Sequence, residues 1–152
     1  MEMENQRIFI NQLTVPQEAI DVNNHVNNVV YVQWMQDVAV MHSDFVGGTE
    51  EMKEWNGGWI IRSHNVEYLA PALANDQLDV ITWVSNLQKI RSLRKYLFVN
   101  RNTGKVLAKG ETQWVFVDVD NGRPKAIPQS LKNRFPVVSD DELNDFVANI
   151  DR

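Results

Sequence analysis

The chain has 152 residues, of which 43% are hydrophobic and 23% are charged, as expected for one globular domain with a core of ordinary size. Its net charge of -5 and its pI near 5.1 argue against nucleic acid or an anionic membrane as the main partner. The absence of cysteine excludes a thiolate nucleophile, disulfide bonds and cysteine-based zinc sites.

In chain order, the first elements are a strand, a polar loop and a long helix. Apolar residues alternate in residues 7–13, which predicts a strand that ends before Pro16. From residue 28 to about 45, apolar residues recur with helical spacing and cover most of the helix circumference. We therefore expect other structure to wrap this helix, and Gly47 and Gly48 to end it.

Strands dominate the chain after a short charged segment at residues 49–55. Four runs rich in β-branched and aromatic residues predict four strands, which cover residues 59–69, 78–87, 93–100 and 106–119. Near the C-terminus, Ser139 and Glu142 form a capping box that predicts a short helix over residues 139–150.

This order of elements predicts an α+β domain, in which a curved antiparallel five-stranded sheet wraps around one long buried helix. We expect a single domain over residues 1–152, with a core from roughly residue 6 to 135. One helix covers only one face of such a sheet, so the other face and the edges need solvent or a second copy of the chain. The large side chains of Trp83, Tyr96 and Trp114 favour a second copy. We therefore expect a homodimer or a dimer of dimers.

A polar segment at the start of the long helix is the strongest functional signal in the sequence. It consists of Asp21, Asn23, Asn24, His25, Asn27 and Asn28. One or two such side chains satisfy the free N–H groups at a helix start. Capping therefore does not account for the whole segment, although a polar surface loop that ends in an Asn cap is the alternative interpretation.

With Asp21 in a loop ahead of a buried helix, the chain resembles the hot-dog fold of acyl-CoA thioesterases, in particular the 4-hydroxybenzoyl-CoA thioesterase-like group. The resemblance covers roughly residues 6–135, and its pattern of an Asp followed by two aromatic residues matches Asp21, Tyr31 and Trp34. Further matches lie in residues 66–71, at Asp76 and in residues 123–128.

The local motif is still closer to that of the plant acyl-(acyl carrier protein) thioesterases. Their sequence Asp-x-Asn-x-His-Val-Asn-Asn-x-x-Tyr-x-x-Trp is intact here, and eight positions at fixed spacing make a specific match. Those enzymes have a further catalytic Glu near the position of Pro71, and two hot-dog units per chain where this chain has one. The matching residues are Asp21, Asn23, His25, Val26, Asn27, Asn28, Tyr31 and Trp34.

The resemblance implies an active site at the helix start, with Asp21, Asn23, His25 and Asn28 as its catalytic residues. Asp21 is either the general base or the nucleophile. The backbone N–H of Asn28 is expected to bind the thioester oxygen. Asn23 is expected to orient water or the thioester, and His25 to bind Asp21 or assist proton transfer, with a structural loop histidine as the alternative.

Two further groups of residues are candidates for substrate binding. Tyr31 and Trp34 lie on the buried helix, where they belong to the core or line an acyl pocket. Lys89, Arg91 and Arg94 form the most basic stretch and are expected to bind the phosphates of CoA, with a solvated turn as the alternative. Because the chain has only three histidines, with no close pairing, we expect no metal site and no cofactor.

The implied function is that of an acyl-CoA thioesterase, which hydrolyses an acyl thioester to free acid and CoA in fatty acid metabolism. An acyl-ACP thioesterase is the alternative within this class, and a dehydratase or a non-catalytic acyl-thioester-binding protein is the alternative from other classes. The acidic N-terminus and the lack of an apolar run near roughly 20 residues predict a cytoplasmic protein without a membrane partner.

Overall fold

The computed structural model describes residues 7–150, so the ends of the predicted 1–152 domain and residue 6 of its predicted core lie outside the described residues. It contains one antiparallel sheet of five strands, as the sequence predicted. The strand order in the sheet is β1-β3-β4-β5-β2. The strands are β1 (Ile8–Thr14), β2 (Gly57–Tyr68), β3 (Gln77–Leu87), β4 (Arg91–Asn100) and β5 (Val106–Asp118). The helices are α2 (Asn28–Val46), α3 (Gly48–Glu54), α4 (Gln129–Lys132) and α5 (Asp140–Ala148), with a short 3-10 turn at Gln17–Ala19.

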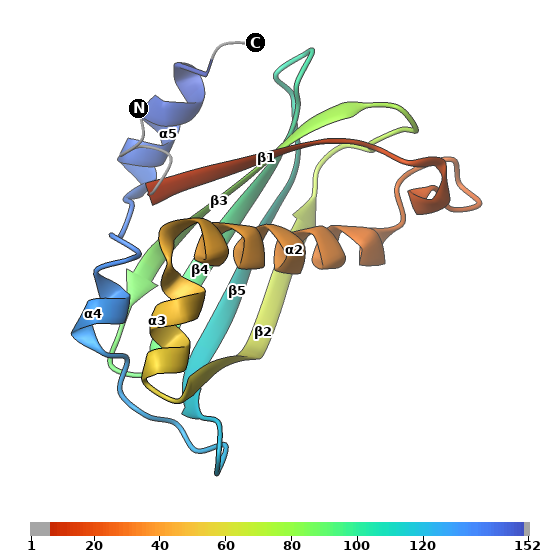
Figure 1. The fold of residues 1–152 in the computed structure, drawn as a ribbon. Helices are drawn as coiled ribbons and strands as arrows, with labels where there is room; N and C mark the ends of the chain where they lie inside the picture. Colours follow the sequence, from red (N-terminus) through yellow and green to blue (C-terminus); the bar gives the residue numbers. More distant parts are fainter. Residues whose placement is uncertain (1–6, 151–152) are drawn as a thin grey trace.

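Helix α2 runs across one face of the sheet, where it forms the main core (Figure 1). Met35, on the inner side of this helix, is fully buried and lies against Gly110 of β5. A Cβ at residue 110 would lie 2.9 Å from the Met35 sulfur, so glycine at this position allows the helix to approach the sheet closely.

Gly47 ends α2 in the left-handed conformation, with φ of 80°, which confirms the predicted helix end. Gly48 then starts α3, a helix of seven residues, where the sequence had indicated only a short charged segment. Phe135 packs closely against Gly48, since a Cβ there would lie 2.5 Å from its ring. The short helix α3 is thereby held over one end of the sheet, beside α4.

The described residues of one chain do not cover the outward side of α2. Val29 and Val40, which share this side of the helix, are 73% and 55% exposed. The prediction that the sheet wraps around this helix is confirmed, and the sheet covers its inner side.

The opposite face of the sheet is partly covered by the C-terminal helix of the same chain. The predicted capping box at Ser139 is present and starts α5, and Leu143 of this helix packs against Trp83. Tyr96 and Trp114 instead belong to the core beneath α2. The large side chains of Trp83, Tyr96 and Trp114 are therefore no argument for a second copy of the chain. The free edge of strand β2 is the better argument.

Strand β2 is a long free edge of the sheet. Eleven of its twelve residues pair with β5 on one side, with a bulge at Arg62, and no described strand pairs with its other side. Ile60 and Tyr68 on this strand are 51% and 43% exposed. Long unpaired edges offer a row of backbone donors and acceptors to another strand.

Candidate active site

The polar segment forms a tight loop that closes on itself just before α2. A β-bridge joins Ile20 to Val26, and the N–H of Asp21 donates a hydrogen bond of 2.9 Å to the carbonyl oxygen of His25. Asn24 at the tip has φ of 65°, in the left-handed region that asparagine tolerates better than most residues. The sequence therefore folds locally into a compact turn.

Two backbone hydrogen bonds attach this loop to the rest of the domain. The N–H of the buried Val26 donates to the carbonyl of Ala72 at 2.9 Å, and the N–H of Asn27 donates to the carbonyl of Ala19 at the same distance. These bonds hold the start of α2 in place between the segments that follow β1 and β2.

Asp21 is half-buried, whereas Asn23 and His25 are exposed. The Oδ1 atom of Asp21 accepts a hydrogen bond from the backbone N–H of Asn23 at 2.9 Å. Its Oδ2 atom makes no hydrogen bond with any residue from 7 to 150 and is available to a water molecule or a substrate. No direct contact between the side chains of Asp21 and His25 is present among the described residues.

The first turn of α2 has one backbone donor without an acceptor. Asn27 is the N-cap: its Oδ1 accepts from the N–H of Val29 at 3.0 Å, and its carbonyl accepts from the N–H of Val30 at 2.9 Å. The N–H of Asn28 has no acceptor in the described part of the chain. It lies at the positive end of the helix dipole, where a developing negative charge is stabilised.

Tyr31 and Trp34 pack below this turn as part of the core. The Tyr31 ring contacts those of Trp34, Tyr68 and Phe98 edge-on, at centroid distances of 5.6, 5.3 and 5.0 Å. Burial raises the pKa of Tyr31 to about 12, so this phenol stays protonated at neutral pH. The Tyr68 hydroxyl donates to the carbonyl of Asn28 at 2.9 Å, which braces the helix start from β2.

The three basic residues predicted to act together do not lie together. Lys89 and Arg91 are exposed near the turn between β3 and β4, whereas Arg94 is only 5% exposed and faces α2. Alternate residues of a strand point to opposite faces of the sheet, and Arg91 and Arg94 are three residues apart. The prediction that all three side chains bind the phosphates of CoA is therefore wrong for Arg94, which is buried on the other face of the sheet.

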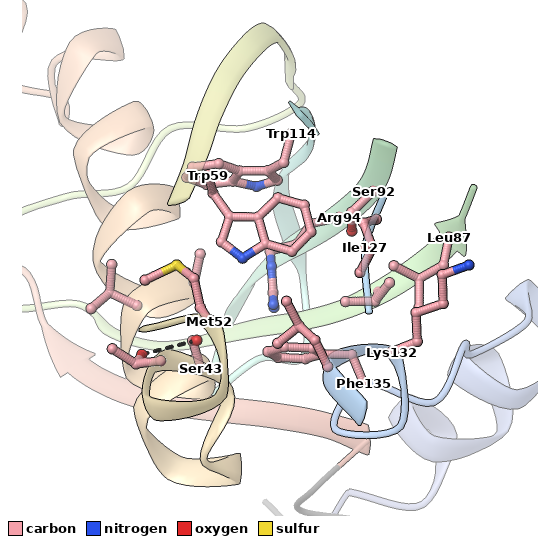
Figure 2. Close-up of a pocket in the computed structure, with 15 residues that line it drawn as sticks. Ser43, Met52, Trp59, Leu87, Ser92, Arg94, Trp114, Ile127, Lys132 and Phe135 are labelled. Carbon is pink, nitrogen blue, oxygen red and sulfur yellow. Dashed lines mark hydrogen bonds between the residues drawn. The ribbon is translucent and has the colours of Figure 1, made fainter. Parts of the chain in front are cut away.

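A cavity of about 260 Å³, which the sequence analysis missed, lies at the other end of α2 (Figure 2). Its walls come from α2, α3, strands β3, β4 and β5, the start of β2 and the segment around α4. Because these segments are far apart in the sequence, no local sequence pattern predicts the cavity. They are Ala39, Val40, Ser43, Thr49, Met52, Trp59, Val84, Leu87, Ser92, Arg94, Trp114, Ile127, Leu131, Lys132 and Phe135. Neither Tyr31 nor Trp34 lines this cavity.

The cavity and the Asp21 loop are far apart within one chain. Helix α2 has 19 residues and is therefore about 28 Å long at about 1.5 Å per residue. The loop precedes its first residue, and the cavity begins at Ala39 in its C-terminal half. One protomer alone does not bring the two features into one site.

Within residues 7–150, no group of three or more His, Asp or Glu side chains is placed to bind a metal ion. None of the helices in this part of the chain is long and apolar enough to cross a membrane.

Comparisons with known proteins agree with the hot-dog architecture. The sequence profile of the thioesterase-like superfamily matches residues 15–135. A chloroplast palmitoyl-acyl carrier protein thioesterase of Cuphea hookeriana is 26% identical over 113 residues, which cover 69% of this chain. The long-chain acyl-CoA thioesterase FadM of Escherichia coli is 20% identical over 123 residues, which cover 81% of this chain and 93% of that protein.

Among solved structures, an acyl-ACP thioesterase from Bacteroides thetaiotaomicron superposes with a TM-score of 0.80 at 20% identity. The match covers 91% of this chain and 56% of that one. This likeness concerns the fold. The match to the Cuphea enzyme spans only 27% of that enzyme's length.

Proposed function

This chain belongs to the thioesterase-like superfamily, and we propose that it is an acyl-CoA thioesterase that hydrolyses an acyl thioester to the free acid and CoA. One observation carries the proposal. A carboxylate oxygen of Asp21 and the N–H of Asn28, both without a partner in the described chain, lie at the same end of α2. Thioester hydrolysis needs one group of each kind.

In the proposed reaction, the thioester oxygen accepts a hydrogen bond from the N–H of Asn28. Asp21 either removes a proton from the attacking water or attacks the carbonyl carbon itself. The carbon–sulfur bond then breaks, and the CoA sulfur leaves and takes up a proton. If Asp21 is the nucleophile, water hydrolyses the resulting anhydride in a second step. One oxyanion donor contributes roughly 3 kcal/mol of transition-state stabilisation.

The exposed side chains of the loop have supporting roles in this proposal. Asn23 orients the water or the thioester, and His25 assists proton transfer, since both lie within four residues of Asp21 on a compact turn. Asn27 keeps the first turn of α2 in place as its N-cap. Tyr31 and Trp34 hold the helix start in position by their packing in the core. They are proposed to contact the acyl group only at its thioester end.

The carrier in the proposal is CoA, with Lys89 and Arg91 as the exposed cations that would meet its phosphates. An acyl-ACP substrate is the second candidate, because the Cuphea and Bacteroides proteins carry that activity in their names. A non-catalytic acyl-thioester binder is the alternative from another class. Consistent with the lack of cysteine, we propose a cytoplasmic location.

We propose that the active unit is a homodimer in which two β2 edges pair. Antiparallel pairing about the strand centre would place the start of one β2, with the cavity residue Trp59, beside the end of the other, with Tyr68. Tyr68 contacts the helix start next to Asp21. The cavity of one protomer would thereby approach the catalytic loop of its partner, which one chain alone does not achieve. A dimer of dimers is the second candidate assembly.

The test of the proposed function is release of free thiol from a panel of substrates. The panel contains acyl-CoAs of increasing chain length, aromatic acyl-CoAs, acyl-ACPs and acyl-pantetheine thioesters. We expect turnover of at least one acyl-CoA series above the uncatalysed rate. Turnover of acyl-ACP alone would replace CoA by ACP as the carrier, and thioester binding without turnover by any substrate would leave the binder alternative.

A further inference from the structure

Arg94 is a buried cation on the wall of the cavity at the C-terminal half of α2. Its Nη1 atom donates to Nδ1 of His42 at 2.9 Å and to Oγ1 of Thr82 at 3.2 Å. Its guanidinium lies 5.5 Å from the centroid of the Phe135 ring. The imidazole of His42, the hydroxyl of Thr82 and the ring of Phe135 therefore hold the arginine in place. Figure 2 shows it among the labelled residues of the cavity.

No carboxylate of the described residues 7–150 balances this charge. None of the ion pairs formed within residues 7–150 includes Arg94, and none of the fifteen residues that line the cavity is Asp or Glu. Lys132 adds a second cation to the wall. Burial lowers the pKa of Arg94 to about 10, so it is still charged at neutral pH. A buried charge without a counter-ion is costly unless a bound group supplies one.

Two neighbouring side chains of β4, Arg94 and Ser92, have hydrogen-bond donors without an acceptor among the described residues. The Nε and Nη2 atoms of Arg94 and the hydroxyl of Ser92 make no hydrogen bond with any described residue. Ser92 is 7% exposed, precedes Arg94 by two residues and therefore points to the same face of the sheet. Both residues line the cavity. The guanidinium has a fork of parallel N–H groups that suits the two oxygens of one carboxylate.

The rest of the cavity wall is mainly apolar, with Trp59, Leu87, Ile127 and Leu131 among its residues. A ligand that matches this wall has an apolar body and a single acidic group. A polyanion such as a nucleotide would leave most of its charges against apolar side chains.

We propose that this cavity binds the carboxylate of a small, otherwise apolar organic acid, with Arg94 as the counter-ion and Ser92 as a second donor. Such a carboxylate has two sources. It is either that of a free acid, or the free carboxylate at the far end of the acyl group of a dicarboxylic acid, whose other end forms the thioester. The second source deepens the proposed thioesterase function and rests on it, whereas binding of a free acid does not.

The first test compares octanoate with octan-1-ol by titration calorimetry, because the two share an apolar chain and differ in the carboxylate. We expect the protein to bind octanoate at least about tenfold more tightly than octan-1-ol, as a charge-assisted hydrogen bond would give. Arg94→Met should remove this difference. Lys95→Met, which removes a cation from the opposite face of the same strand, should preserve it. Equal affinities for the two ligands in the unsubstituted protein, or no binding of octanoate, would overturn the proposal.

A second variant covers the case in which Arg94→Met does not fold. Ser92→Ala removes only one hydroxyl, and it should weaken octanoate binding severalfold while leaving octan-1-ol unchanged. Unchanged octanoate binding by a folded Ser92→Ala protein, together with unchanged binding by any folded Arg94 variant, would also overturn the proposal.

The second test identifies the source of the carboxylate. If the far end of the acyl group enters the cavity, kcat/KM should be higher for adipoyl-CoA than for hexanoyl-CoA, and Arg94→Met should reverse that order. Preference for hexanoyl-CoA alongside tight octanoate binding would assign the cavity to free acids. Octanoate binding without hydrolysis of any thioester would refute the proposed function and leave the cavity assignment intact.

Discussion

The N-cap of α2 offers a way to separate catalytic from structural effects at the candidate site. Asn27→Ala removes the acceptor of the 3.0 Å hydrogen bond from the N–H of Val29. Loss of an N-cap costs about 1 kcal/mol of folding free energy. In a domain of this size that corresponds to a fall in Tm of about 2–4 °C. The variant should therefore remain folded at assay temperature, since domains are commonly stable by about 5–15 kcal/mol.

Activity should fall by more than this small loss of stability implies. Asn27 holds the first turn of α2, and Asn28 on that turn is proposed to donate to the thioester oxygen. Loss of an oxyanion donor costs roughly a hundredfold or more in kcat, and a loosened donor should cost part of that. We expect kcat/KM to fall about tenfold, measured by free-thiol release, with the Tm followed by circular dichroism.

Ser139→Ala is the matched control, because Ser139 caps α5 by an equivalent hydrogen bond from the N–H of Glu142 at 3.1 Å. It should lower the Tm by a similar amount and leave kcat/KM unchanged. Asn27→Asp keeps an acceptor at the cap and adds a charge favoured by the helix dipole, so it should preserve stability. The added charge lies next to the developing oxyanion and should still lower kcat. Equal activity of Asn27→Ala and Ser139→Ala would refute the proposed role of the helix start.

Three further results are expected. Replacing Lys89 and Arg91 by Ala should raise KM for acyl-CoA and leave acyl-pantetheine unaffected, and equal changes for both substrates would show that these residues do not contact the nucleotide. Light scattering at micromolar concentration should give about twice the chain mass of 17.6 kDa, whereas a fully active monomer would exclude the β2-paired dimer. Glu51 accepts a hydrogen bond from Ser130 at 2.8 Å, which with other contacts lowers its pKa below the usual 4.5. Its stabilisation is therefore present above about pH 4.5 and lost as the pH falls through the lowered pKa, so the Tm difference between the protein and Glu51→Gln should shrink from pH 7 to pH 3.

The long elements were predictable because their signals are local. Helix α2 was expected at residues 28–45 and spans Asn28–Val46, since its N-cap, helical spacing and terminal glycine all agree. Helix α3 was missed because its seven residues are mostly polar. It depends on tertiary contacts such as that of Gly48 with Phe135, which a local pattern does not contain.

The basic cluster shows how one strand boundary changes a functional prediction. The strand was expected to begin at residue 93, which left Arg91 in a turn beside Lys89. Strand β4 instead begins at Arg91. Side chains therefore alternate between the two faces of the sheet from Arg91 onward, and Arg94 points to the inner face while Arg91 points to the outer one. The cavity beside Arg94 was not predictable, because its walls come from segments between Ala39 and Phe135 that only the fold brings together.

The most direct test of the account is the turnover of Asp21→Asn. Asparagine retains an oxygen that can accept the hydrogen bond from the N–H of Asn23, so folding and Tm should stay close to those of the unsubstituted protein. It lacks the charge of a base or nucleophile, so kcat/KM for the best thioester should fall at least about a hundredfold. A folded Asp21→Asn protein that hydrolyses the thioester at the rate of the unsubstituted protein would contradict the assignment of catalysis to this loop.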